Sequence, residues 1–368
     1  MLRIGITGQA GFVGTTLYNH LGIRNSDFER IPFEDSYFNT PAKLSEFVRS
    51  CDVIVHLAAM NRDPDPQVIY DTNIRLVKEL ISAMERENVR PHVLFSSSTQ
   101  ETLDNMYGKS KAEGRAMFEK WAEKVGASFT GLVIPNVYGE FSRPNYNTFI
   151  ATFSHKLING EEPQILVDNN VRLIHVGSLC RFIISQFSNS GVKRVEVPYD
   201  FEMKVTDILA KLRDFNNLYT LHGIIPNLKD CNDINLFNTF RSYIEPAAVQ
   251  LEQHADERGV FVETIKLGVG GQVSFSTTKP GITRGNHYHT RKIERFTVIK
   301  GKASIELRRI GTDKVYHFEL DGKNPAYVDM PVWYTHNITN IGTEELYTQF
   351  WINEIYNPAD GDTYFEKV

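Results

Sequence analysis

The pattern of strands and helices changes near residue 250, and this change constrains the fold more than any other feature. Before it, short apolar runs such as 2–7, 52–59 and 92–98 alternate with stretches whose apolar residues recur at helical spacing. Such alternation predicts a parallel sheet with helices on both faces. After about residue 258, short strands follow one another with Gly, Pro or Asn between them, which is typical of an antiparallel sandwich or barrel.

We therefore expect an α/β protein of two domains. Residues 1–246 would form a Rossmann-type doubly wound parallel sheet, and residues 247–368 an all-β barrel. The net charge of −5 shows no excess of basic residues, so we expect no nucleic-acid partner. The chain shows no membrane-length apolar run, no signal peptide and only three scattered cysteines, so we expect a cytoplasmic protein without disulfides. A homodimer is the default assembly.

A glycine-rich turn follows the first apolar run and precedes a helical stretch. Gly8 permits a tight turn, Gly11 lets backbone N–H groups approach a pyrophosphate, and Gly14 lets the helix pack close to the strand. A turn without a ligand is the alternative, but the strand before it and the helix after it are the context that a dinucleotide site requires. The spacing predicts a nucleotide-binding turn.

Tyr107 and Lys111 are four residues apart, so they would share one face of a helix. An ammonium beside a phenol lowers the phenol's pKa from about 10 toward the working range, which suits proton transfer. Upstream, the serines of 96–98 end an apolar strand, from which a hydroxyl can reach the same pocket. An amphipathic helix surface would explain the Tyr–Lys pair alone, but the three elements together predict a catalytic site.

Roughly the first 240 residues resemble the extended short-chain dehydrogenase/reductase family. The glycine-rich turn, the serines of 96–98 and the Tyr107–Lys111 pair occur in the order found in that family, together with the runs at 52–59, 71–73 and 134–139. Members of that family bind NAD(P) and act on nucleotide-linked sugars. The resemblance implies that Tyr107 is the acid/base, Lys111 binds the nicotinamide ribose, and Ser98 polarises the substrate carbonyl. It assigns the cofactor to Gly8, Gly11, Phe12, Val13, Gly14, Leu57, Ala58, Asn73 and Lys111, and the sugar-nucleotide side to Asn136 and 143–147.

Two departures from that family bear on the reaction. No clear strand ending in Asp or Glu occurs within 22–40, where such an acid would bind the ribose of NAD. Arg24 or Arg30 could instead meet a 2′-phosphate, which favours NADPH, unless both arginines are solvated surface charges. Thr99 follows Ser98 where dehydratases of the family carry an acid, which favours reduction or epimerisation over dehydration.

A second candidate site lies in the C-terminal region. His287 and His289 are two residues apart, so on one strand they point to the same face, and Glu294 and His336 follow. Three imidazoles and one carboxylate form a ligand set for Zn²⁺, Mn²⁺, Fe²⁺ or Ni²⁺. We expect one divalent transition metal, Zn²⁺ before the others, and it can be structural or catalytic. Hydrogen-bonded barrel histidines without a metal are the alternative.

The spacing of His287, His289 and Glu294 between Gly281 and Gly301 resembles the first motif of the cupin superfamily, which implies a jelly-roll barrel, and His336 falls in the second motif. The second cupin motif is partial, since Trp333 stands where Gly is usual. Residues 256–263 resemble the opening of nucleotide-sugar 3,5-epimerases, which are cupins that exchange the proton beside a sugar ketone. The candidate bases are His254, Glu263 and Tyr334, and Arg258 either stabilises the enolate or forms a structural ion pair with Glu263.

An extended reductase fused to a cupin resembles the CapF family, the bifunctional enzymes of capsular polysaccharide synthesis, over essentially the whole chain. The resemblance implies that the cupin epimerises C3 of a UDP-2-acetamido-2,6-dideoxy-hexos-4-ulose, and that the first domain then reduces the C4 ketone with NADPH, on the route to UDP-N-acetyl-L-fucosamine. Epimerisation must come first because the ketone acidifies C3–H. Two alternatives stay open: a reductase whose cupin only binds sugar or dimerises, and a C4 epimerase that retains its NAD.

Overall fold

The computed structural model describes the chain except residues 147, 257–258, 263, 268–269 and 355–356, and leaves the side chains of 253–262 and 267 undescribed. By compactness the chain divides into two units, one of Met1–Thr152 and Val167–Val205, the other of Phe153–Leu166 and Thr206–Val368. The boundary expected between 246 and 247 therefore lies inside the second unit. No helix in the described part is long and apolar enough to cross a membrane.

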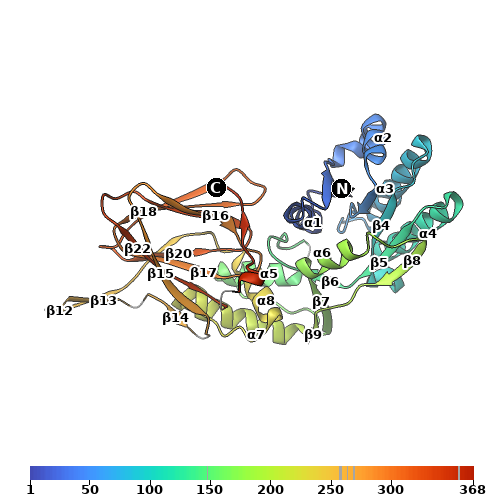
Figure 1. Cartoon of the computed structure of the whole chain (residues 1–368). Helices are drawn as coiled ribbons and strands as arrows, with labels where there is room; N and C mark the ends of the chain where they lie inside the picture. Colours follow the sequence, from blue (N-terminus) through green and yellow to red (C-terminus); the bar gives the residue numbers. More distant parts are fainter. Residues whose placement is uncertain (147, 257–258, 263, 268–269, 355–356) are drawn as a thin grey trace. The chain divides into compact units, whose positions relative to one another are not determined.

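Six parallel strands form the central sheet of the first unit, in the order β2-β1-β3-β4-β5-β8 (Figure 1). Their bounds are β1 Leu2–Thr7, β2 Phe28–Ile31, β3 Val53–His56, β4 His92–Ser98, β5 Phe129–Ile134 and β8 Val192–Glu196. The chain leaves β1 toward β2 on one side and then crosses to β3 on the other. Ligands of such sheets bind at this change of direction, beyond the carboxyl ends of the strands.

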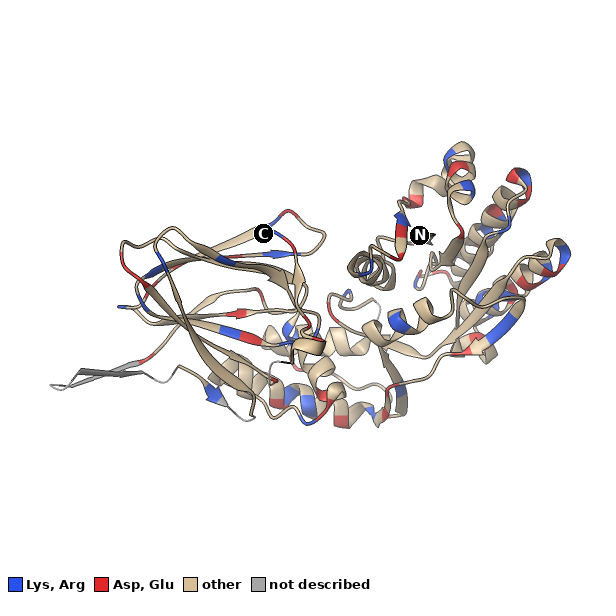
Figure 2. Cartoon of the chain, viewed as in Figure 1, with Lys and Arg blue, Asp and Glu red and all other residues tan. Residues whose placement is uncertain are grey.

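Helices cover both faces of this sheet, which confirms the doubly wound α/β class. On one face, α1 (Phe12–Ile23) and α6 (Val176–Ser185) pack on an apolar core with β1, β3, β4 and β5. On the other, α2 (Pro41–Ser50), α3 (Pro66–Glu87) and α4 (Met106–Val125) pack on a second core. Figure 2 shows acidic and basic residues interleaved along α2, α3 and α4, so these helices carry both signs of charge.

Several shorter elements complete the first unit. A three-stranded sheet joins β6 (Asn136–Tyr138), β7 (Asn170–His175) and β9 (Phe201–Lys204), and α5 (Phe149–Ile158) begins in this unit and ends within the Phe153–Leu166 segment of the second. Single turns of 3₁₀ helix occur at Asp35–Asn39 (η1) and Thr99–Thr102 (η2). Within 22–40 the short strand β2 pairs with β1, and it ends at Ile31 and not at an acid.

Two antiparallel five-stranded sheets dominate the second unit, which confirms the all-β C-terminal region. Their orders are β11-β20-β17-β22-β15 and β19-β18-β21-β16-β23. The first sheet comprises β11 Ala248–Gln250, β20 Ala326–Met330, β17 Glu294–Lys300, β22 Leu346–Ile352 and β15 Gln272–Thr278. The second comprises β19 Val315–Asp321, β18 Lys302–Arg309, β21 Tyr334–Asn340, β16 Thr283–Tyr288 and β23 Tyr364–Phe365.

Helical segments precede these sheets in the second unit. They are α7 (Val205–Phe215), a π-helical turn η3 (Asn216–Leu221) and α8 (Cys231–Arg241). Two short strands, β10 (Ile224–Ile225) and β14 (Lys266–Leu267), pair in parallel, and β12 (Gln253–Asp256) pairs with β13 (Gly259–Val262). A 3₁₀ turn η4 (Pro358–Asp360) lies shortly before β23. Residues 206–246 therefore belong by compactness with the β-rich unit, although their sequence pattern is helical.

Candidate active site and candidate metal centre

The predicted glycine turn lies at the carboxyl end of β1, where the sheet changes direction. Gly8 has φ +70°, and a Cβ there would lie 2.8 Å from the Ala58 nitrogen. A Cβ at Gly14 would overlap the Gly8 carbonyl oxygen. Because neither position has room for a side chain, the backbone turns tightly into α1, whose N-terminus begins at Phe12. Phe12 and Val13 thus lie in the first turn of the helix that would face a pyrophosphate.

The segment after β3 is held against this turn. Leu57 N donates to the Thr7 carbonyl at 3.2 Å, and Ala58 N donates to Thr7 Oγ1 at 3.4 Å. The Asn73 amide bonds both backbone groups of Met60, at 2.7 and 3.1 Å, and donates to Ser110 Oγ at 3.0 Å. The structure thus places Leu57 and Ala58 beside the glycines. Asn73 positions the segment that follows β3, and its contact with a cofactor stays a prediction.

Tyr107 and Lys111 lie one turn apart near the start of α4, as predicted. The Asn105 side chain caps this helix by accepting from Gly108 N at 2.7 Å. The Lys111 ammonium is buried and donates to the Ser96 carbonyl at 2.9 Å, and burial lowers its pKa to about 8. Ser98 ends β4, and its hydroxyl accepts from Gln100 N at 3.1 Å. The carboxyl end of β4 and the first turns of α4 thus carry all three predicted catalytic residues.

The predicted effect of Lys111 on Tyr107 is wrong. Burial raises the pKa of the Tyr107 phenol to about 12, where a lowering was expected. The reason is geometric: Lys111 Nζ lies 5.6 Å from the centre of the Tyr107 ring, and its hydrogen bond goes to the strand carbonyl instead. A phenol with a raised pKa keeps its proton at neutral pH, which suits a proton donor better than a base.

Glu101 is a positioning residue that the sequence analysis missed. Its buried carboxylate accepts from Ser97 Oγ at 2.6 Å, Arg115 at 3.1 Å and Arg194 at 2.9 Å. Burial raises its pKa, but these hydrogen bonds outweigh the burial and leave the pKa lowered, so the group is ionised. The network fixes the turn that follows Ser98. In the sequence, the feature that could have identified Glu101 was its position three residues after Ser98, a predicted catalytic residue.

The two arginines proposed for a 2′-phosphate differ in their surroundings. Arg24 forms an ion pair with Asp27 at 2.7 Å. Arg30 lies next to the end of β2, donates to the Tyr18 carbonyl at 3.2 Å, and stacks 4.3 Å from the centre of the Tyr18 ring. Sheets of this kind bind the ribose near the end of this strand. Because the charge of Arg24 already has a carboxylate partner, Arg30 is the better candidate.

The residues predicted on the sugar-nucleotide side follow β5. Asn136 begins β6, and its Nδ2 donates to the Arg172 carbonyl at 3.4 Å. The Arg143 guanidinium lies 5.3 Å from the centre of the Tyr146 ring. The last residue of that stretch, 147, lies outside the described residues. The structure thus connects Asn136 to β7, and a role for these residues in substrate binding stays a prediction.

The four predicted metal ligands come together in the second unit, although they come from three strands and a turn. One ligand atom of each of His287, His289, Glu294 and His336 lies within 4.8 Å of the others. Glu294 Oε2 lies 3.0 Å from His289 Nε2 and 3.3 Å from His336 Nε2. These three atoms are buried, and none makes a well-formed hydrogen bond with a described protein group. Buried polar atoms that converge in this way fit a divalent cation.

The charge states of two of these residues, Glu294 and His287, also fit a cation. Burial raises the pKa of Glu294, but the His289 and His336 imidazoles outweigh it and hold this carboxyl ionised, well below its usual range. Burial and the two neighbouring imidazoles lower the pKa of His287 to about 4, so its ring is neutral at pH 7. Neutral imidazoles and an ionised carboxylate are the forms that bind a metal.

Asp362, which the sequence analysis missed, orients one of these ligands. Its carbonyl oxygen accepts from His289 Nδ1, so Nε2 carries the lone pair that faces the cluster. The Asp362 carboxylate accepts from Thr290 Oγ1 at 2.7 Å and from the backbone N–H groups of Thr290, Arg291 and Lys292 at 2.9 to 3.0 Å. The tail thus fixes the turn between β16 and β17. In the sequence, the feature that could have identified Asp362 was its position directly after Gly361 in a polar C-terminal segment.

Trp333, which departs from the cupin motif, retains the backbone geometry of a glycine. Its φ is +62°, its N–H donates to the His289 carbonyl at 2.8 Å, and its ring stacks on Tyr288. The left-handed conformation is uncommon for a bulky residue, and here burial of the indole accompanies it. Of the candidate bases, Tyr334 is buried and its pKa is raised to about 12. Glu263 and Arg258 lie outside the described residues, and the His254 side chain is not described.

Two family models match the chain, one in its N-terminal half and one in its C-terminal part. Residues 4–191 match the NAD dependent epimerase/dehydratase family, and residues 254–364 match the polysaccharide biosynthesis C-terminal domain. A reductase of UDP-2-acetamido-2,6-beta-L-arabino-hexul-4-ose from Pseudomonas aeruginosa is 32% identical over 375 aligned positions, which cover 99% of this chain and 98% of the relative.

Solved structures resemble the chain over its whole length. The capsular polysaccharide assembling protein CapF from Staphylococcus aureus covers 100% of both chains, with 32% identity and a TM-score of 0.62. The structure of RMD from Pseudomonas aeruginosa complexed with NADPH covers 59% of this chain and 84% of its own, with 19% identity and a TM-score of 0.53, and shows the shared fold alone.

The fold and the first site define the class of an extended short-chain dehydrogenase/reductase that binds a nicotinamide cofactor. The chain belongs to the NAD-dependent epimerase/dehydratase family, and within it to the CapF-like members that carry a polysaccharide-biosynthesis C-terminal domain.

Proposed function

We propose that this protein is a bifunctional nucleotide-sugar enzyme. It epimerises C3 of a UDP-2-acetamido-2,6-dideoxy-hexos-4-ulose in the β-rich unit and then reduces the C4 ketone with NADPH in the first unit. The observation that carries the proposal is that one chain holds both a glycine turn and a Tyr–Lys–Ser group at the carboxyl ends of strands of one parallel sheet, and a buried cluster of three imidazoles and one carboxylate. The full-length relative named as a reductase of such a 4-keto sugar supports it.

In the reductase half, Ser98 polarises the C4 carbonyl and Tyr107 donates the proton that its oxygen takes up. With its pKa raised to about 12, the phenol is protonated at neutral pH, so it has the proton that this step needs. Lys111 binds the ribose, with an ammonium whose burial lowers its pKa to about 8. The nicotinamide supplies the hydride when it is bound. Arg30 would meet the 2′-phosphate that distinguishes NADPH from NADH.

In the epimerase half, His287, His289, Glu294 and His336 would hold the metal, with Zn²⁺ the first choice. When bound, the cation supplies positive charge that stabilises an enolate beside the ketone. A base of the barrel removes the C3 proton and a proton returns to the other face. Tyr334 is the candidate whose side chain the structure describes, and it shares a strand face with His336.

Proton NMR of the 4-keto sugar nucleotide in D₂O tests both halves. We expect deuterium to enter C3 without cofactor, and the ketone to disappear only after NADPH is added. The matched variants are His336→Ala, which should abolish exchange but still reduce a ketone that is supplied already epimerised at C3, and Tyr107→Phe, which should abolish reduction but not exchange. Reduction with no exchange at any stage would contradict the bifunctional proposal.

One observation favours a second candidate, a reductase whose β-rich unit only binds sugar or dimerises. The full-length relative is named as a reductase alone. The same NMR experiment separates the two, since this candidate reduces the ketone without incorporating deuterium. If the chain were instead a C4 epimerase, oxidised cofactor would copurify with it and NADPH would not be consumed.

We also propose that the protein acts as a homodimer in the cytoplasm. Closed dimers are the commonest assemblies of such enzymes, and all three cysteines are free thiols, as in proteins of reducing compartments. Light scattering coupled to size exclusion should give the mass of two chains. A mass of one chain would contradict the dimer.

A further inference from the structure

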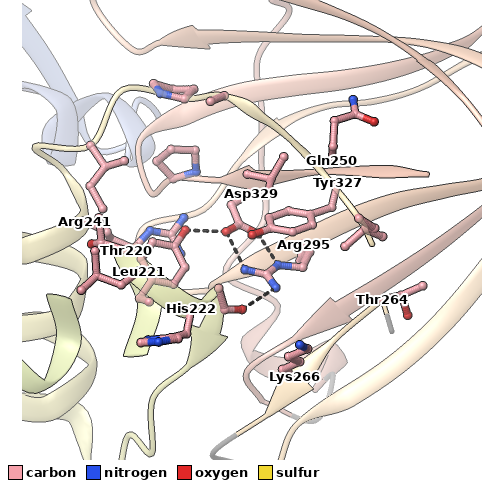
Figure 3. Close-up of a pocket in the computed structure, with 18 of the residues that line it drawn as sticks. Thr220, Leu221, His222, Arg241, Gln250, Thr264, Lys266, Arg295, Tyr327 and Asp329 are labelled. Carbon is pink, nitrogen blue, oxygen red and sulfur yellow. Dashed lines mark hydrogen bonds and ion pairs between the residues drawn. The ribbon is translucent and has the colours of Figure 1, made fainter. Parts of the chain in front are cut away.

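A cavity in the second unit is lined by residues of α8, β17 and β20, among them Arg241, Arg295 and Asp329 (Figure 3). Its volume is about 380 Å³, within the roughly 300–1,000 Å³ typical of small-molecule sites. Glu294 and Arg295 are consecutive residues of β17, so their side chains leave opposite faces of the strand. Glu294 belongs to the metal cluster and Arg295 lines the cavity, so the two sites are separate.

Arg241, the last residue of α8, shares the charge of one carboxylate, Asp329, with Arg295, and one of its N–H groups is left without a bond in the described residues. Only 3% of this residue is exposed, and its Nη2 donates to the Met330 carbonyl at 2.6 Å. Its Nη1 is buried and has no hydrogen-bond partner in the described part of the chain, where Arg241 also forms no ion pair. A guanidinium stays charged at every pH that proteins tolerate. A buried charge that shares its counter-ion with a second cation is only partly compensated, so a further anionic partner would stabilise it.

The buried acid of the cavity, Asp329, attracts Arg241 electrostatically but supplies only one negative charge, and its hydrogen bonds go to other residues. Asp329 accepts from Arg295 Nε at 2.8 Å and Nη2 at 3.0 Å, and also from the Tyr219 hydroxyl. Arg295 Nη1 donates in turn to the Gly223 carbonyl at 3.0 Å. Figure 3 shows this bidentate pair as dashed lines. The buried lining therefore holds two guanidinium groups against one carboxylate.

The remaining acids that line the cavity stand at its exposed rim. The Glu245 side chain is 81% exposed and lies 3.5 Å from Lys314, and Glu252 is exposed. Lys266 is a third cation at the rim. Apolar side chains, including Leu221, Ile244 and Val249, line the rest. A ligand that fits this lining has one anionic group directed inward and a less polar remainder directed toward the opening.

We propose that this cavity binds a small molecule through an oxyanion, either a phosphoryl or a carboxylate group, with Arg241 as the direct partner of the anion and Lys266 at the rim. A guanidinium presents paired donors that match either oxyanion. The site is additional to the nucleotide-binding turn and to the metal cluster. It stands on the geometry of the second unit alone and does not depend on the proposed function.

Thermal unfolding at constant ionic strength tests the proposal, with sodium chloride replaced stepwise by sodium phosphate in one arm and by sodium acetate in the other. Ligands that bind only the folded state raise the unfolding midpoint by mass action. We expect the midpoint of the wild-type chain to rise in at least one arm, and the stronger arm identifies the oxyanion. Arg241→Met should lose that response, and its midpoint in chloride should equal or exceed that of the wild type, because one of the two guanidinium groups that share Asp329 is gone.

Two further variants complete the test. Lys266→Met changes an exposed residue, so it should fold normally and weaken the response several-fold. Lys302→Met, which removes a lysine that is 63% exposed and outside the cavity, should respond as the wild type does. Phosphate bound at the glycine turn raises all midpoints equally and cancels in the comparison.

Three results would overturn the proposal. The first is an equal response of wild type and Arg241→Met. The second is a lower midpoint of Arg241→Met in chloride with no response of the wild type, which would mean that the chain itself balances the charge. The third is a rise of the unfolding midpoint of Lys266→Met that equals the rise of the wild type. This result decides the test if Arg241→Met does not fold.

Discussion

His289 and Asp362 are 73 residues apart in the sequence, yet the imidazole Nδ1 of the first donates to the carbonyl oxygen of the second. The Asp362 carboxylate bonds the three backbone N–H groups that follow His289. One residue therefore sets both the tautomer of a candidate metal ligand and the turn that carries it. Partners of this kind tune a metal site nearly as strongly as the ligands do.

Asp362→Ala should weaken metal affinity by about 10- to 100-fold, because the turn after His289 loses its anchor. Competition of Zn²⁺ between the protein and a chromophoric chelator measures the change. Asp360→Ala is the matched control, since that acid is largely exposed and pairs with Arg291. Equal affinities of wild type and Asp362→Ala would show that the tail does not support the site.

Tyr107→Phe should lower the kcat of ketone reduction by about 10²- to 10⁴-fold, the usual contribution of a positioned proton donor. NADPH affinity, followed by fluorescence, should change little, because the phenol hydroxyl acts on the substrate. Tyr70→Phe removes another tyrosine hydroxyl of the same unit, one bonded to Glu113, and should retain activity. Full activity of Tyr107→Phe would exclude the phenol as the proton donor.

Arg30→Ala should reduce the affinity for NADPH more than that for NADH, because only NADPH carries the 2′-phosphate. Titration of both cofactors by isothermal calorimetry gives the ratio. Arg24→Ala is the control, since Asp27 already neutralises that side chain. A variant that loses affinity for both cofactors equally would assign Arg30 to the packing of α1 and not to cofactor choice.

The stability of the first unit should fall as the pH drops from about 6.5 toward 3. Burial lowers the pKa of His56 to about 3, and the nearby Lys111 adds to the effect. Between those values the unfolded chain binds a proton that the folded chain does not, so stability rises with pH by up to about 1.4 kcal/mol per pH unit for this residue.

Urea unfolding of wild type and His56→Gln at pH 7 and pH 5 measures that difference. The variant should show the shallower pH dependence, and His317→Gln, which changes a half-exposed histidine, should match the wild type. Parallel slopes for wild type and His56→Gln would mean that His56 is not responsible.

The sequence predicted the parts of this molecule that depend on periodicity and local spacing. The parallel sheet, the glycine turn and the pairing of Tyr107 with Lys111 on one helix all follow from neighbours in the chain. The four candidate metal ligands were predicted because His287 and His289 are two residues apart and the others match spaced motifs, although β16 ends one residue before His289. Strand β2 is only four residues long, and its charged Glu29 and Arg30 hide the apolar pattern.

What the sequence did not predict depends on burial and on contacts between distant segments. Burial raises the pKa of Tyr107, and its ammonium neighbour bonds a strand carbonyl, which no spacing predicts. Asp362 and Glu101 act through hydrogen bonds to groups far away in the sequence or on another element. Residues 206–246 have a helical pattern, and only their packing shows that they belong by compactness with the β-rich unit.

The separation between His289 and Asp362 also has a consequence for the order of assembly. The candidate ligands and their anchor span β16, β17, β21 and the segment before β23, so no short peptide from this region contains the complete site. Contacts of such long range form late and slowly in folding. Any cation that binds here with full affinity is therefore loaded after the barrel closes, and the rate of loading reports on maturation of the β-rich unit.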